Sequence, residues 1–146
     1  MAESLLSRVV VPVAGPDDAA ATCEVAVPHV AAAGGSLTAV YVVEKAGGAI
    51  DKASVEQREE FAEEAFEAVR SACNGADVDC STEIVFGTDV VDAILDFGRD
   101  TDASAIVFSP RRGSRWLDLL SGNLSAKLVK QADRPVIVFP SDGEEE

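Results

Sequence analysis

The sequence predicts a doubly wound α/β domain with a five-stranded parallel sheet in the strand order 3-2-1-4-5. Five short apolar runs alternate with helical patterns, which is typical of a parallel sheet covered by helices on both faces. The 146 residues suffice for one compact domain. Right-handed crossovers then leave a switch point between the first and fourth strands, where ligands bind in such sheets.

The chain opens with a strand and a helix. Arg8–Val13 is almost continuously apolar, as expected of a parallel strand buried on both faces. Asp17 and Asp18 suit the positive end of a helix dipole, and an alanine-rich helix then runs until Gly34-Gly35. Pro28 cannot donate a hydrogen bond, so we expect a kink within that helix.

A second strand and a long amphipathic helix follow. Ser36–Val43 predicts the strand, and Ser54 with Gln57 predicts a capping box for a helix that reaches about Cys73. The acidic residues of this helix favour a solvated face over a cation site. Its apolar stripe consists of Val55, Phe61, Ala62, Ala65, Phe66 and Val69.

The next elements lead to the carboxyl end of the fourth strand. Asn74-Gly75 predicts a turn, and the alternating pattern of Val78–Phe86 predicts a strand at a sheet edge. Asp89–Arg99 has helical spacing of apolar residues. Ala105–Ser109 then predicts a short buried strand.

The last helix begins at Ser121 or Gly122 and ends near Ala132, and Pro135–Phe139 predicts the fifth strand. Residues 1–140 therefore form one domain. The acidic residues 141–146 are expected to be a disordered tail.

Charge and composition exclude several partners. A net charge of −14 and an isoelectric point near 4.3 oppose binding to nucleic acid or to anionic lipid. High acidity around a core rich in alanine and valine predicts a halophilic protein, because salt screens self-repulsion. The chain has neither an 18-residue apolar run nor a signal-peptide pattern at its start, so we expect no membrane span and a cytoplasmic location.

The cysteines and the histidine offer little support for catalysis. Cys23, Cys73 and Cys80 have no metal-ligand spacing, so we expect reduced thiols. Cys73 and Cys80 could meet across a helix–strand turn, although a disulfide is not expected. His29 has no catalytic partner in its sequence context, which favours a structural role. We expect neither an enzyme nor a bound metal.

Several segments resemble the universal stress protein family. Val10-Val11-Pro12-Val13-Ala14-Gly15 resembles its first strand and turn, where the family usually reads V-P-V-D-G-S. Ala39–Glu44 resembles the end of the family's second strand. Gly87-Thr88 resembles the pair before its third helix, and Pro135–Val138 resembles its closing strand. The resemblance covers about residues 6–140 and implies a flavodoxin-like fold and a role in stress response.

The resemblance also implies a nucleotide-binding loop with changed residues. Nucleotide-binding members carry G-x-x-G, nine residues, then G-[S/T], which brings backbone and a helix N-terminus to the phosphates. Ser109, Arg112, Gly122 and Asn123 occupy the four motif positions, and only Gly122 matches. Gly113 lies one place beyond the expected second glycine.

Two functional hypotheses follow. Under the first, the protein acts in stress response by binding and regulation without ATP. Under the second, it binds ATP or AMP through a loop rebuilt around Arg111 and Arg112, since guanidinium groups suit phosphate. Surface ion pairing is the alternative role for these arginines. The candidate binding residues are Pro12, Val13, Ala14, Val42, Ser109, Arg111, Arg112, Gly113, Gly122, Asn123, Leu124 and Ser125.

The last strand predicts a homodimer. Val136, Ile137, Val138 and Phe139 form an apolar edge strand that would otherwise be exposed, and the resemblance implies antiparallel pairing of last strands. Trp116 and its leucine neighbours lie in the loop between the fourth strand and the last helix. They would cover the ligand cleft at the switch point as a lid, contact a partner subunit, or pack beneath their own loop. The sequence names no other protein partner.

Overall fold

The structure, a computed structural model, describes residues 4–44, 52–108 and 124–139. These residues form a five-stranded sheet in the order β3-β2-β1-β4-β5, and every neighbouring pair is parallel. The predicted fold class and strand order are therefore confirmed. The strands are β1 (Arg8–Val13), β2 (Ser36–Glu44), β3 (Asp79–Gly87), β4 (Ala105–Phe108) and β5 (Val136–Val138). The helices are α1 (Pro16–Ala32), α2 (Lys52–Ala76), α3 (Val90–Asp100) and α5 (Leu124–Gln131).

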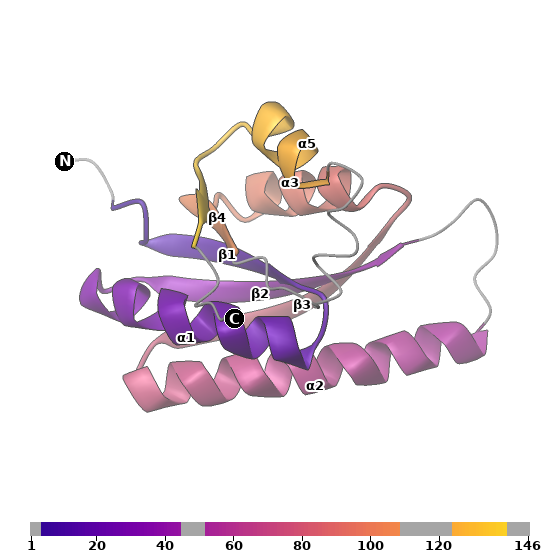
Figure 1. Cartoon of the computed structure of the whole chain (residues 1–146), viewed down its shortest axis with the longest axis horizontal. Coiled ribbons are helices and arrows are strands. Elements are labelled where there is room, and N and C mark those ends of the chain that lie inside the picture. The colour runs from indigo at the N-terminus through magenta and orange to yellow at the C-terminus, as the bar shows by residue number, and fades with distance from the viewer. Residues whose placement is uncertain (1–3, 45–51, 109–123, 140–146) are drawn as a thin grey trace, which may run out of the picture.

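Helices cover both faces of the sheet (Figure 1). Helices α1 and α2 lie on one face, and α3 and α5 lie on the other. The alternation along β1 follows from this arrangement: Val9, Val11 and Val13 belong to the core beneath α1 and α2. Val10 points to the other side, where it packs with Val40. A strand buried on both faces needs a nearly continuous apolar run, and β1 has one.

The two edge strands differ in length and in neighbours. β3 pairs with β2 from Ser36↔Asp79 to Glu44↔Gly87, and its side chains alternate in exposure along most of its length. This alternation confirms the predicted edge strand. Among the described strands β5 lies at the opposite edge and pairs with β4, from Ile106↔Val136 to Phe108↔Val138.

Helix α2 ends at Ala76, three residues later than the Cys73 end that the Asn74-Gly75 pair predicts. Asn74 and Gly75 lie within α2, and Asp77 takes the left-handed conformation with φ 58°. The Val78 N–H donates to the Cys73 carbonyl at 2.9 Å, and the Asp77 N–H donates to the Asn74 carbonyl at 3.3 Å, which is a Schellman motif. Packing of the helix end against the core outweighs the turn preference of Asn74-Gly75, because Ala76 contacts the main cluster.

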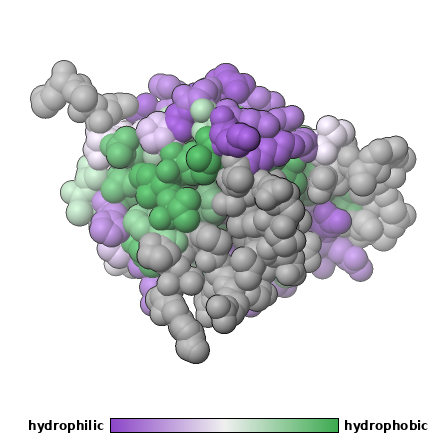
Figure 2. Space-filling model, turned by 45° about the horizontal axis from the view of Figure 1, so that its top comes forward, coloured by the Kyte–Doolittle hydropathy of each residue, from purple (hydrophilic) through white to green (hydrophobic). Residues whose placement is uncertain are grey.

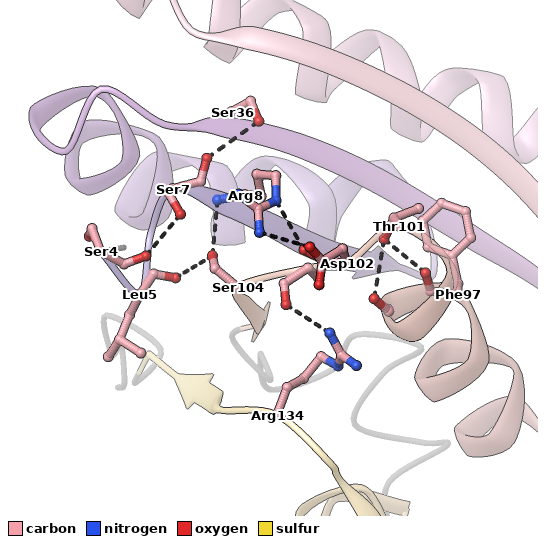
Figure 3. A network of polar contacts seen from close by, with 12 residues as sticks. Ser4, Leu5, Ser7, Arg8, Ser36, Phe97, Thr101, Asp102, Ser104 and Arg134 are labelled. Atoms are coloured by element: carbon pink, nitrogen blue, oxygen red, sulfur yellow. Dashed lines mark hydrogen bonds and ion pairs between the residues drawn. The ribbon is translucent and has the colours of Figure 1, made fainter. Parts of the chain in front are cut away.

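A network of polar contacts joins the amino ends of β1 and β4 (Figure 3). The Arg8 N–H donates to Ser104 Oγ at 2.9 Å, and that hydroxyl donates to the Leu5 carbonyl at 2.7 Å. The Arg8 guanidinium donates to the Asp102 carbonyl at 3.0 Å and pairs with its carboxylate at 3.3 Å. Arg134 extends the network from the segment before β5 by donating to the Ala103 carbonyl. Hydrogen bonds and an ion pair therefore stabilise the amino ends of β1 and β4, whereas the candidate site lies at their carboxyl ends.

Candidate functional site

Strands β1 and β4 meet at the switch point of the sheet. β1 pairs with β2 along its whole length, to Val13↔Tyr41, but it pairs with β4 only at Val9↔Ala105 and Val10↔Ile106. Pro12, which is buried, has no N–H with which to extend a ladder. The ladder between β1 and β4 therefore stops short of their carboxyl ends, which is where ligands bind in this type of sheet.

Several predicted site residues gather around this end of the sheet. Val13 and Ala14 are buried, and Val42 packs with Ala14 in the cluster beneath α3 and α5. Leu124 and Ser125 form the beginning of α5. The other predicted residues lie outside the described residues, as does Trp116. They are Ser109, Arg111, Arg112, Gly113, Gly122 and Asn123.

Asp18 turns back from α1 into the junction between β1 and α1. Its side chain is 2% exposed, and its Oδ2 accepts a hydrogen bond from the Ala14 N–H at 3.0 Å. Burial raises the pKa of this carboxyl to about 7, although hydrogen bonds from the Ala14 and Gly15 N–H groups work in the opposite direction. Sequence reasoning assigned Asp18 to the helix dipole and did not find its burial, because spacing alone does not show that a carboxylate is buried.

Gly15 is held under an aromatic ring from α2. A Cβ atom at Gly15 would lie 2.8 Å from Cζ of Phe61. The backbone of Gly15 is extended, with φ 177°, so its lack of a side chain matters for this close approach and not for a left-handed conformation. Phe61 was predicted as part of an apolar stripe, and no local signal shows that it covers the β1–α1 turn.

A salt bridge joins α5 to the beginning of α3. Asp89 caps α3 by accepting a hydrogen bond from the Asp92 N–H at 3.0 Å, and its Oδ2 lies 2.7 Å from Nζ of Lys127. This contact lowers the pKa of Asp89 and raises that of Lys127. Lys127 therefore brings a positive charge close to the beginning of α5. Sequence reasoning missed it, because its partner lies in a different segment.

The described residues offer few other groups for chemistry. His29 lies in the last turn of α1, where its ring stacks on Phe139 with centroids 5.5 Å apart and planes 11° apart. Cys23, Cys73 and Cys80 are free thiols. Within residues 4–44, 52–108 and 124–139, no group of three His, Cys, Asp or Glu side chains is placed to hold a metal ion. The same residues include no helix that is both long and apolar enough to cross a membrane.

Comparisons with solved structures find several universal stress proteins among the similar folds. A universal stress protein family member from Burkholderia pseudomallei is 22% identical with a TM-score of 0.76, and the match covers 94% of this chain and 98% of that one. UspA from Lactobacillus plantarum is 24% identical with a TM-score of 0.66, covering 92% and 97%. A universal stress protein from Archaeoglobus fulgidus, solved in complex with dAMP, is 20% identical with a TM-score of 0.68, covering 92% and 98%.

These similarities of structure establish the fold. No curated protein matches the chain. The family model of the universal stress proteins matches residues 6–140, nearly the whole sequence. The chain therefore belongs to the universal stress protein family.

Proposed function

We propose that this stress-response protein acts by binding and regulation without bound ATP. The main support is the position of Asp18. The resemblance implies that nucleotide-binding members contact the nucleoside with an acidic side chain at the position of Ala14, which here is a methyl group. The nearby carboxylate of Asp18 is 2% exposed and already accepts the Ala14 N–H, so it is not available to replace that contact.

The changed loop supports the same proposal. Ser109 and Arg112 occupy two glycine positions of the family motif, and a side chain at such a position limits how closely the backbone approaches a phosphate. Hydrolysis of ATP would need the same contacts, so we propose that the protein is not an enzyme.

Binding of ATP or AMP remains the second candidate. Solved structures with 20% and 19% identity contain dAMP and cAMP respectively. Arg111 and Arg112 would supply guanidinium groups for phosphate, and Lys127 would add a charge beside the beginning of α5. If a phosphate replaced Asp89 as the partner of the Lys127 ammonium, that ammonium would still be in an ion pair.

Isothermal titration with AMP and ATP, each with and without magnesium, separates the two candidates. The titrations are made at multimolar KCl. We expect no saturable heat and no adenine nucleotide in an acid extract of the purified protein. Saturable binding that is lost in the Arg111→Ala, Arg112→Ala double variant, but kept in the control Arg58→Ala on the solvent side of α2, would establish the second candidate instead.

We also propose a cytoplasmic homodimer that pairs through β5, with Val136, Ile137, Val138 and Phe139 at the contact. Val138 is 45% exposed at the sheet edge, and a space-filling view of this side of the molecule has a continuous apolar area (Figure 2). Unpaired apolar edges invite pairing with another chain. The free thiols suit a reducing compartment.

Light scattering coupled to size-exclusion chromatography tests the dimer. We expect the wild-type mass to be that of two chains and the Val138→Lys variant to be monomeric. Ser81→Lys is the matched control, because it places the same charge on the opposite edge strand, β3. A monomeric wild-type protein at high salt would refute the proposed dimer.

A further inference from the structure

The three cysteines converge from separate elements onto one side of the sheet. Cys23 lies on α1 and Cys73 on α2, and both are fully buried in the same cluster. Cys80 is the second residue of β3 and packs against that cluster while remaining half-buried. The Cys80 side chain packs against the cluster that contains Cys73, and its interaction with Cys73 contributes, after burial, to the raised pKa of the Cys73 thiol. Cys80 is thus the most accessible of the three thiols, and it packs against a cluster that contains the two buried ones.

Backbone hydrogen bonds determine the positions of Cys73 and Cys80. The hydrogen bonds of the Schellman motif, from Val78 to Cys73 and from Asp77 to Asn74, determine the path between helix and strand. Cys80 is held in turn by the β2–β3 ladder, in register with Leu37. The helix–strand turn therefore brings both thiols to the same cluster, where a disulfide would join the end of α2 to the beginning of β3.

We propose that Cys73 and Cys80 are an oxidisable pair that a hydroperoxide converts to an intramolecular disulfide. The Cys80 sulfur attacks one peroxide oxygen and the O–O bond breaks, which leaves a sulfenic acid and, with hydrogen peroxide, one molecule of water. The Cys73 sulfur then displaces the hydroxyl group, the S–S bond forms, and the Cys73 proton leaves in a second water. Two thiols lose two electrons and two protons, and the peroxide is reduced to two waters.

The different environments of the two thiols determine the order of these steps. Burial, with a smaller contribution from Cys80, raises the pKa of Cys73 to about 12. Cys73 therefore stays protonated and shielded while Cys80 meets the oxidant. The Cys73 thiol gives up its proton as its sulfur bonds to the Cys80 sulfenic acid, and that proton leaves with the displaced hydroxyl group as water. This oxidation site is independent of nucleotide binding and of the proposed dimer.

Thiol counting on the folded protein tests the proposal. The wild type is treated with hydrogen peroxide, excess peroxide is removed, free thiols are alkylated, and the protein is digested without a reductant and mapped by mass spectrometry. We expect the three free thiols to fall to one, at Cys23, and a cross-linked peptide that joins Cys73 to Cys80. Cys73→Ser should instead accumulate a sulfenic acid at Cys80 that reacts with dimedone, whereas Cys23→Ala should form the disulfide as the wild type does.

Two results would overturn the proposal. One is a folded wild-type protein that keeps three alkylatable thiols at peroxide concentrations that oxidise a small-molecule thiol. The other is a cross-link that involves Cys23 or joins two chains. Both results are measured on the wild-type protein, so they can refute the proposal even if a variant fails to fold.

Discussion

Replacement of Asp18 by asparagine should remove a large pH dependence from the stability of the protein. In the folded state burial raises the pKa of Asp18 from 3.8 to about 7, so the folded state binds a proton more tightly than the unfolded chain. The stabilising contribution of that proton is fully present below pH 3.8 and is lost as the pH rises through 7. A difference of roughly three pKa units corresponds to about 4 kcal/mol at 1.36 kcal/mol per unit.

Asparagine keeps the shape of the side chain and an oxygen that can accept the Ala14 N–H, but it does not titrate. We therefore expect the stability of Asp18→Asn relative to the wild type to rise between pH 4 and pH 8, by up to about 4 kcal/mol. The assay is urea unfolding at constant high KCl across this pH range. The other carboxylates titrate alike in both proteins, so their contributions cancel in the difference.

Asp17→Asn is the matched control, since Asp17 is the exposed neighbour on the same helix turn. A pH-dependent difference that appears with Asp18→Asn and not with Asp17→Asn would assign that dependence to the buried carboxylate. A flat difference between Asp18→Asn and the wild type, or a difference that falls as pH rises, would refute the reasoning about the buried carboxylate.

Three further predictions concern stability. Gly15→Ala should lower the free energy of unfolding in urea by about 1–3 kcal/mol, because the new methyl group meets the Phe61 ring. Adding Phe61→Leu to this variant should recover part of that loss. Equal stability of Gly15→Ala and the wild type would contradict the contact. Asp77→Gly should be neutral or stabilising by up to about 1 kcal/mol in the same assay, whereas Asp77→Val should lose about 1–2 kcal/mol, because Asp77 has a positive φ. The thermal midpoint should rise steadily with KCl, since the net charge is −14; an unchanged midpoint from low to multimolar KCl would count against halophilic adaptation.

Local pattern was enough to predict the architecture. Continuous apolar runs such as Arg8–Val13 identify strands buried on both faces, and helical spacing between them requires crossover connections. The strand order then located the switch point between β1 and β4. These features depend on periodicity and chain direction, which are properties of neighbouring residues.

The sequence by itself therefore determined the fold class and the strand order, and with the strand order the switch point of the sheet. Only the tertiary structure decided how Asp18 is buried against Ala14, how Phe61 covers Gly15, and how Cys80 packs against the cluster that contains Cys73. It also decided that α2 continues through Asn74-Gly75. The physical reason is the range of the interactions: secondary structure follows from local spacing, whereas desolvation and close packing depend on side chains that separate elements bring together.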